Sequence, residues 1–368
     1  MGCKPVLISD IASINARQYS NKEQWPIIRY LDTGNVTKGK IGAPQVLDTS
    51  ADKVPSRARR KVKNASIVFS MVRPNQEHHA LLDYPPDDML VSTGFSVIDA
   101  DKSKVVPDYL YYALTTKEAT EHFQALAEQS VSTYPTLGID DLASFEVELP
   151  NIDVQRRVSF FLKALDKKIA SNEQINDYLR ELASRLFDQL VERCVDSTML
   201  GTYIDISSGK RPPVKSPHLT DECFIPLYGA SSQMGYTSEH LTDEKLLIIG
   251  RVGTHGVVQR VNSKAWPSDN TLVIRPSHYE IAFQLLQRID YASLNRGSTQ
   301  PLITQADLKA CEVPLIDSKS LGLYESQTGE LMALYDHNFR ESTVLAQLRD
   351  TLLPGLMSGE IDASQVVI

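Results

Sequence analysis

The sequence predicts an α/β protein with a pseudo-twofold internal repeat, in which two globular α/β regions are separated by a long antiparallel two-helix coiled coil. Three observations predict this fold. One stretch of sequence recurs at a fixed offset, heptads of apolar residues follow each copy, and β-rich runs mix with helical stretches before each copy. The expected bounds are 1–150 for the first globular region, 151–196 for the first helix, 197–316 for the second region and 317–368 for the second helix and a tail.

The internal repeat is clearest at the end of each globular region. Residues 132–149 (STYPTLGIDDLASFEVEL) align without gaps with residues 298–315 (STQPLITQADLKACEVPL), at an offset of 166. Eight of the eighteen positions are identical, whereas ordinary residue usage gives about one by chance. The same offset persists through the helix that follows. Upstream the likeness is weaker and the offset shifts, which indicates insertions in loops.

A heptad pattern follows each copy of the repeat. No Pro or Gly occurs from Asp153 to Val191, and the second helix is expected from about Tyr324 to Leu353, with Gly329 weakening its first turns. One seam position recurs every seven residues: Val158, Leu165, Asn172, Leu179 and Leu186 in the first helix, and Tyr324, Leu331, Asn338, Leu345 and Leu352 in the second. The complementary position is assigned to Phe161, Ile175 and Leu182, interrupted by Lys168, and to Leu334 and Leu348.

The two helices are expected to pair with each other. The first leads away from its globular region, and the second follows the second region and can lead back, so an antiparallel pair results. The alternative is that each helix packs only on its own globular neighbour. Asn172 and Asn338 lie near the helix centres, where two buried Asn residues would approach the pseudo-twofold axis and fix the register. Alternatively, both side chains face solvent.

Residue patterns also predict elements inside the globular regions. The apolar runs Ile67–Val72 and Leu246–Ile249 are typical of buried strands, and Pro107–Leu114 and Tyr279–Ile289 are typical of helices. Three large aromatic residues are candidates for stacking on nucleic-acid bases or for the core: Trp25, Tyr30 and Tyr134.

Charge restricts how the chain could bind nucleic acid. The formal net charge of −8 argues against binding through bulk positive charge but allows local basic patches. The densest patch has six cations within residues 53–63. It predicts phosphate contacts, with a solvated charged loop as the alternative. The candidate DNA contacts are Arg57, Arg59, Arg60, Lys61 and Lys63, together with Arg73 beyond the next strand.

The second globular region has glycine-containing segments at 208–213, 228–233 and 250–256. Glycine lets the backbone approach a ligand closely, although a turn that needs glycine for its geometry accounts for these segments equally well. The polar side chains beside the glycines are candidate contacts to phosphates or base edges: Lys210, Arg211, Gln233, Arg251 and His255.

Several other classes of function are disfavoured. No Walker A loop, G-x-G-x-x-G fingerprint, or methyltransferase or nuclease motif is recognisable, so no catalytic residue is assigned. The four cysteines are far apart and no His lies at ligand spacing from them, so no metal site is expected. No apolar run approaches the roughly eighteen residues of a membrane helix, and the N-terminus lacks the order of a signal peptide. A cytoplasmic protein that does not contact membranes is expected.

The chain resembles the specificity subunits of Type I restriction–modification systems over nearly its whole length. Residues 348–361 (LRDTLLPGLMSGEI) are similar to the distal conserved region of that family, and residues 147–190, with Gln155, Asp166 and Ile169, to its central conserved region. The stretch PSRARRKVKNASIVFSMVRPN resembles one type of target-recognition segment. PLYGASSQMGY, IIGRVGTHG and WPSDNTLVI resemble a second type.

The resemblance implies a non-catalytic subunit. Each globular region would be a target recognition domain that reads one half of an asymmetric bipartite site in double-stranded DNA. The helical pair would set the spacer and dock two methyltransferase (modification) subunits, through which restriction/translocase subunits join. S-adenosylmethionine, ATP and Mg²⁺ are expected on those partners, with no cofactor on this chain. A helix of about 39 residues spans roughly 58 Å, more than the ~34 Å of one DNA turn.

The second repeat departs from the family pattern at two positions. Leu321 stands where the first repeat has Gln155, and Met332 stands where it has Asp166. These departures weaken the expectation that a modification subunit docks on that side.

Three alternatives stay open at this point. One is a specificity subunit of a related system in which a single fused methyltransferase–nuclease partner both methylates and cuts. Another is an enzyme that carries its own site, which the absence of cofactor and nuclease motifs disfavours. The third is a coiled-coil interaction scaffold with no role on DNA, which salt-dependent DNA binding would exclude.

Overall fold

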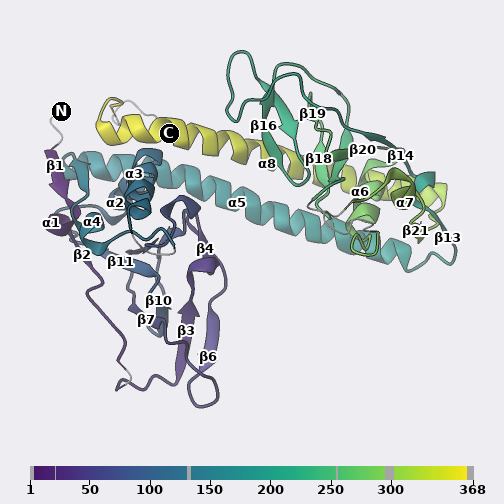
Figure 1. Ribbon diagram of the computed structural model, residues 1–368. Helices are drawn as coiled ribbons and strands as arrows, with labels where there is room; N and C mark the ends of the chain where they lie inside the picture. The colour runs from purple at the N-terminus through teal and green to yellow at the C-terminus, as the bar shows by residue number, and fades with distance from the viewer. Residues whose placement is uncertain (1–3, 21, 131–133, 254–255, 295–301, 363–368) are drawn as a thin grey trace. The chain divides into compact units, whose positions relative to one another are not determined.

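The structure is a computed structural model that describes residues 4–20, 22–130, 134–253, 256–294 and 302–362 (Figure 1). The chain forms two compact units. The first unit holds the residues up to 170 together with those from 343 onward, and the second unit holds residues 171–342. Each unit combines one globular region with one stretch of each long helix.

The globular part of the first unit contains two four-stranded sheets (Figure 1). One sheet has the order β2-β11-β8-β9, in which all neighbours are antiparallel, and the other has the order β6-β3-β10-β7, in which β3 and β10 are parallel. The strands of the first sheet are β2 Ala12–Ile14, β8 Ser66–Ser70, β9 His79–Leu81 and β11 Phe95–Ala100. Those of the second are β3 Ile27–Leu31, β6 Gln45–Asp48, β7 Ala58–Lys61 and β10 Met89–Ser92.

Shorter elements complete the first unit. Strand β1 pairs with β12, and β4 pairs with β5. The bounds are β1 Lys4–Leu7, α1 Ile8–Ile11, β4 Val36–Thr37, β5 Lys40–Ile41, α2 Pro107–Leu114, α3 Lys117–Glu128, α4 Ile139–Ala143 and β12 Glu146–Leu149, with 3-10 turns at Thr33–Asn35 and Pro74–Gln76. All five residues of β8 are buried, because this strand lies inside its sheet and α2 and α3 add Tyr109, Leu110 and Phe123 to the same core.

The globular part of the second unit also has two sheets, with the orders β14-β20-β17-β18 and β16-β15-β19. The strands are β14 Ile204–Ser208, β15 Ile225–Tyr228, β16 Gln233–Thr237, β17 Leu246–Gly250, β18 Gln259–Val261, β19 Trp266–Pro267 and β20 Thr271–Pro276. Strand β13 (Ser197–Met199) pairs with β21 (Glu312–Pro314). The helices are α6 Tyr279–Gln287 and α7 Gln305–Lys309, with a 3-10 turn at Leu200–Thr202.

The two globular parts repeat one topology. The order β2-β11-β8-β9 corresponds strand by strand to β14-β20-β17-β18, and the parallel pair β3/β10 corresponds to β15/β19. Single bridges also correspond, since Val72 pairs with Thr136 and Val252 with Leu302. The predicted duplication is therefore confirmed, and so are the two buried strands and the two helices expected before each repeat.

Both long helices are continuous, α5 over Ile152–Val191 and α8 over Ser318–Ser358. Helix α8 begins earlier and ends later than expected, because Leu321 packs into the core at its start and Leu356 and Met357 do so beyond Pro354. Burial of these apolar side chains outweighs the helix-breaking tendencies of Gly322 and Pro354. No helix in the described part of the chain is long and apolar enough to cross a membrane.

Within each unit the α5 and α8 segments pair antiparallel. In the first unit Arg349 Nη1 donates to Asp166 Oδ1 over 2.6 Å. In the second unit Tyr324 Oη donates to the Ala183 carbonyl over 2.9 Å, and Asn338 Nδ2 donates to Asn176 Oδ1 over 3.1 Å. As the α5 residue number rises, the number of its α8 partner falls.

The seam differs from the prediction at its second position. Ile175 and Leu182 are 43% and 45% exposed, and Leu334 and Leu348 are 46% and 42% exposed, so the assignment of these four residues was wrong. Phe161, the remaining apolar residue assigned there, is half-buried against the core of the first unit. The buried position lies one residue further along α5 and is occupied by Leu162, Asn176 and Ala183. In α8 it includes Thr328 and Tyr335. Polar residues at buried positions hid this register from a search for apolar heptads.

The residues predicted for the first seam position are buried or half-buried. Asn172, Leu179 and Asn338 are buried, and the half-buried members are Leu165, Leu186, Leu331, Leu345 and Leu352. Asn172 and Asn338 do not bond to each other. Asn172 Nδ2 donates to Glu341 Oε2 (2.7 Å) and Ser342 Oγ (3.3 Å), while Asn338 bonds to Asn176. Each buried amide therefore finds its partner on the facing helix.

Candidate nucleic-acid interface

In the first unit, sheet topology brings distant cations to one end of a sheet. Strands β2 and β8 are both antiparallel to β11, so their carboxyl ends lie beside the amino end of β11. Arg73 follows β8, and the Arg57 carbonyl accepts a hydrogen bond of 2.9 Å from the Thr93 amide, just before β11. We call this place the first strand-end edge, defined by Arg57, Arg73, Thr93 and Tyr134.

The two arginines of the first strand-end edge are available to an anion. Among the described residues, no carboxylate lies within ion-pair distance of Arg57 or Arg73. The Arg73 guanidinium lies 5.1 Å from the centre of the Tyr134 ring, a cation–π contact. Arg73 also has a left-handed backbone, with φ of 49°, which is a strained conformation for a non-glycine residue.

Three other cations of the basic run, Arg59, Arg60 and Lys61, lie on edge strand β7 and have different surroundings. Arg59 Nε donates to the Ser56 carbonyl over 3.3 Å. Arg60 is half-buried, and this burial lowers the pKa of its guanidinium. Its Nε has no hydrogen-bond partner among the described residues. Lys61 forms an ion pair with Glu23 and lies 5.1 Å from the Trp25 ring. The basic run is therefore not one continuous patch.

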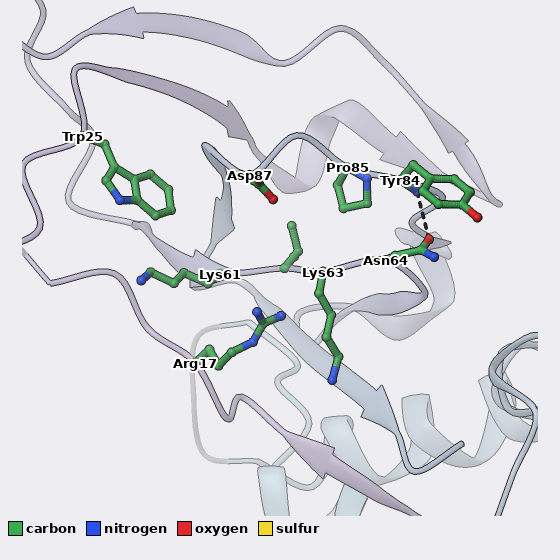
Figure 2. Close-up of a pocket in the computed structure, with 9 residues that line it drawn as sticks. Arg17, Trp25, Lys61, Lys63, Asn64, Tyr84, Pro85 and Asp87 are labelled. Carbon is green, nitrogen blue, oxygen red and sulfur yellow. Dashed lines mark hydrogen bonds between the residues drawn. The ribbon is translucent and has the colours of Figure 1, made fainter. Parts of the chain in front are cut away.

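An open groove of about 390 Å³ lies beyond the end of β7 (Figure 2). Its walls are Arg17, Trp25, Lys61, Val62, Lys63, Asn64, Tyr84, Pro85 and Asp87. Figure 2 shows Trp25 beside Lys61 at one end and Tyr84 beyond Asn64 at the other. The Tyr84 amide donates to Asn64 Oδ1 over 3.0 Å, and Tyr84 is 80% exposed.

The cations of this groove are largely compensated. Arg17 and Lys63 lie 3.7 and 3.5 Å from the buried carboxylate of Asp99, and Lys61 is paired with Glu23. The hydrogen bond from Lys61 is the main cause of the lowered pKa of Glu23. Because these cations already have carboxylate partners, the groove attracts an anion less strongly than the first strand-end edge does.

The second unit places its candidate residues at the corresponding end of its sheet. Strands β14 and β17 are antiparallel to β20, so Lys210 and Arg211 after β14 and Arg251 after β17 lie near the start of β20. The Arg251 amide donates to the Asn270 carbonyl over 2.8 Å, which fixes this arrangement. Gln233 begins β16 opposite Tyr228. We call Lys210, Arg211, Gln233 and Arg251 the second strand-end edge.

Cations of the second strand-end edge have the same availability as those of the first. In the part of the chain that the structure describes, Lys210, Arg211 and Arg251 have no carboxylate within ion-pair distance. Gln233 Nε2 donates to the Gly235 carbonyl over 3.3 Å. His255 lies outside the described residues.

The glycines beside this edge have a clear backbone role. Gly253 and Gly256 have φ values of 86° and 84°, which disfavour any other residue. At Gly209 a Cβ atom would lie 2.1 Å from the Ser268 carbonyl oxygen. Glycine is therefore required here by chain geometry, and the same geometry places Lys210 and Arg251 at the edge.

The two departures of the second repeat lie inside the fold. Gln155 is 1% exposed, donates to the Pro150 carbonyl and accepts from the Val106 amide at the start of α2. Leu321 and Met332 are 7% and 1% exposed and belong to the core of the second unit. Glu325, one turn beyond Leu321, accepts from the amides of the second and third residues of α6, Glu280 and Ile281. The exchanges therefore replace polar contacts of the first unit, including the pair between Asp166 and Arg349, with apolar core packing in the second.

Three cysteines, Cys194, Cys223 and Cys311, are free thiols. Among the described residues, no group of three His, Cys, Asp or Glu side chains is arranged to hold a metal ion. The first strand-end edge combines two arginines with a hydroxyl group and an aromatic ring, and the second combines basic and amide side chains with glycine-containing backbone. Both compositions are suited to phosphates and base edges.

Comparison with known proteins bears on this arrangement. Residues 3–181 and 199–318 match the family described as the Type I restriction modification DNA specificity domain. The chain belongs to this family. The resemblance inferred from the sequence motifs is thereby confirmed, and the two matched segments coincide with the two copies of the duplicated fold.

Individual relatives agree with this family membership. The HindI specificity subunit of Haemophilus influenzae is 28% identical over 50% of this chain, but that match spans only 39% of the relative's length. The MjaIX specificity subunit of Methanocaldococcus jannaschii is 23% identical over 72% of this chain and 71% of its own. The crystal structure of a Type I restriction–modification S subunit from M. genitalium has 19% identity and a TM-score of 0.61, over 97% of this chain and 96% of that chain, and supports the fold.

Proposed function

We propose that this chain is the sequence-reading specificity subunit of a Type I restriction–modification complex, and that each globular part reads one half of a bipartite site in double-stranded DNA. The observation that carries the proposal is the pair of strand-end edges. Two copies of one topology present uncompensated cations at the same end of the same sheet. A chain with net charge −8 needs such local sites to hold a polyanion.

The two edges differ in composition, which favours an asymmetric site. The first offers Arg57 and Arg73 with the Tyr134 ring, a set suited to phosphates and to stacking. The second offers Arg251 and Gln233, which have the geometry to bind guanine and adenine edges in the major groove. Lys210 and Arg211 beside them suit the flanking phosphates.

The long helices suit the role of a spacer. Helix α5 has 40 residues, so at about 1.5 Å per residue it is roughly 60 Å long. That length exceeds the ~34 Å of one DNA turn, so a helix of this size can separate two reading surfaces that approach successive major grooves. The spacer would then contain base pairs that the chain does not read.

Exposed apolar side chains on the helices support docking of two methyltransferase subunits. In the second unit Ile175, Tyr178 and Leu182 share one face of α5, and Tyr178 is 62% exposed. In the first unit Val344 and Leu348 share one face of α8, and Val344 is 61% exposed. Apolar residues gathered on an otherwise charged helix are typical of a protein interface. Restriction/translocase subunits would join through the methyltransferases.

The proposal assigns no chemistry to this chain. Methyl transfer from S-adenosylmethionine and Mg²⁺-dependent ATP hydrolysis would take place on the partner subunits. This chain would bring them to a chosen DNA sequence.

Methylation mapping tests the proposal. Single-molecule sequencing of DNA from cells that carry this gene and its neighbouring methyltransferase gene should show an asymmetric, bipartite, adenine-methylated motif. That motif should disappear when this gene alone is deleted. Methylation that is unchanged by the deletion would contradict the proposal.

A further inference from the structure

A buried ion-pair network joins the second globular part to helix α8. Arg260 of β18 donates through Nε and Nη2 to Asp336 of α8, over 2.8 and 3.0 Å. The same guanidinium donates through Nη1 and Nη2 to Glu280 of α6, over 2.6 and 3.0 Å. One arginine therefore makes two bidentate contacts and connects a strand, the domain helix α6 and the long helix α8.

The network is almost completely shielded from water. The side chains of Arg260, Glu280 and Asp336 are 5%, 2% and 10% exposed. The Arg260 guanidinium lies 4.9 Å from the Tyr279 ring and 4.8 Å from the Phe283 ring. Burial disfavours the charged guanidinium, but the hydrogen bonds to Asp336 and Glu280 outweigh burial, so the pKa of Arg260 is raised. The Arg260 guanidinium is therefore held in its charged form.

The network does not follow from a need for stability. Buried ion pairs contribute little net stability, because desolvation of the charges offsets their attraction, and apolar residues of similar size are often as good or better. The first unit provides a direct comparison. The strand position that corresponds to Arg260, which faces Leu247 in its sheet, is Leu81, which faces Ile67. An aliphatic residue therefore suffices there for packing.

The first unit also attaches its domain helix in a more exposed way. Asp108 is the second residue of α2, as Glu280 is of α6. It pairs with Lys163 of α5 over 2.7 Å, but the two side chains are 22% and 41% exposed. A lysine pair that is open to water tolerates many geometries, whereas a buried guanidinium bound bidentately on both sides fixes direction as well as distance.

We propose that Arg260 is a positioning residue of the second recognition domain: by binding Glu280 and Asp336 together it fixes the angle between that domain and α8, and thereby the number of unread base pairs between the two half-sites. The inference rests on the proposed function. A small angle is sufficient. For a domain edge about 20 Å from the helix, a rotation of about 10° moves the edge by about 3.4 Å, which is one base-pair step.

The test replaces the network and keeps the packing. Arg260→Met alone would leave the buried Asp336 carboxylate without its ion-pair partner and the buried Glu280 with Lys245 alone, and it is expected to impair folding. The informative variant is therefore the triple substitution Arg260→Met, Glu280→Leu and Asp336→Leu, which removes every charge of the triad. The control is Lys163→Gln with Asp108→Asn, which removes the exposed pair of the first unit. Both chains are expressed with the neighbouring methyltransferase gene, and methylated sites are mapped in cells.

The expected result is a wider distribution of spacer lengths. The triple variant should methylate sites whose spacer is one base pair longer or shorter than that of the wild-type motif, with both half-site sequences unchanged. The control should keep the wild-type spacer. Assembly and folding of each complex are checked by co-purification and thermal unfolding.

Two results would overturn the inference. One is a folded, assembled triple variant that methylates only the wild-type spacer. The other is such a complex that methylates no spacer length at all, because the triad would then be needed for reading or assembly and not for spacing. Failure of the proposed function itself is recognised separately, since the wild-type chain would then produce no motif that depends on its gene.

Discussion

The salt dependence of DNA binding distinguishes the first strand-end edge from the groove of Figure 2. We compare two double variants in the assembled complex: Arg57→Gln with Arg73→Gln at the edge, and Lys61→Gln with Lys63→Gln in the groove. Each removes two positive charges and takes the formal net charge from −8 to −10 (−8 minus 2), so long-range effects are matched. The edge arginines have no carboxylate partner among the described residues, whereas the groove lysines pair with Glu23 and Asp99.

The expected magnitude follows from counterion release. Each phosphate contact contributes about 0.9 to the slope of log K against log salt, so loss of both edge arginines should reduce that slope by about 1.8. If the wild-type chain and the edge variant bind equally at 1 M salt, where the phosphate contribution vanishes by extrapolation, the variant should bind about 60-fold more weakly than the wild type at 0.1 M salt. This factor corresponds to about 2.4 kcal/mol of binding free energy. Sequence preference should not change, because phosphate contacts carry none.

The assay is fluorescence anisotropy with a labelled duplex that contains the mapped site, titrated at several salt concentrations. The groove variant should retain a slope close to that of the wild-type chain. An unchanged slope in the edge variant, or an equal reduction in both variants, would refute the reasoning that carboxylate-free arginines mark the DNA surface.

Three further predictions follow from single side chains. Arg251→Gln should make one position of one half-site degenerate and cost about 1–3 kcal/mol in binding, as seen by methylation mapping and competition binding; an unaltered motif would remove Arg251 from the reading set. Arg260→Met should lower the free energy of unfolding by about 3–5 kcal/mol in denaturant titration, and adding Glu280→Leu and Asp336→Leu should restore most of it. Burial lowers the pKa of His79 to about 4, below its unfolded value of 6.5, so the neutral ring stabilises the fold above pH 6.5 and this contribution is lost as pH falls from 6.5 toward 4. His79→Gln should flatten that window in pH-dependent unfolding, and a stability profile identical to wild type would contradict the assignment.

Local sequence patterns predicted the duplicated sheets well. The run Ile67–Val72 is apolar except for Ser70, and its counterpart Leu246–Ile249 is apolar throughout, because a strand inside a sheet that is covered on both faces buries every side chain. Such a strand is recognisable without any tertiary information. The constant offset of 166 between residues 132–149 and 298–315 also indicated that the two globular regions are copies of one fold.

The helix register could not be predicted in the same way. Asn176 and Thr328 are buried, whereas Ile175 and Leu334 are exposed, so an apolar search selects the wrong complementary position. The buried polar residues find partners that sequence does not reveal: Asn176 bonds to Asn338, and Thr328 bonds to the Tyr324 carbonyl.

Long-range charge pairing was also invisible in the sequence. Lys63 belongs to the densest basic run, yet its partner Asp99 lies 36 positions further along the chain and also attracts Arg17. The triad of Arg260 spans β18, α6 and α8 and follows no spacing rule. Only the fold shows which cations of a basic run already have a carboxylate partner and which are available to DNA.

Exchange of one globular region tests whether each globular part reads its own half-site. Residues 197–316 are replaced by the corresponding region of another family member whose methylated motif is known, and methylation is mapped in cells with the neighbouring methyltransferase gene. We expect a hybrid motif in which one half-site takes the donor's sequence and the other half stays as in the wild type. A motif that changes in both halves, or in neither, would contradict the claim that each globular part reads its own half-site.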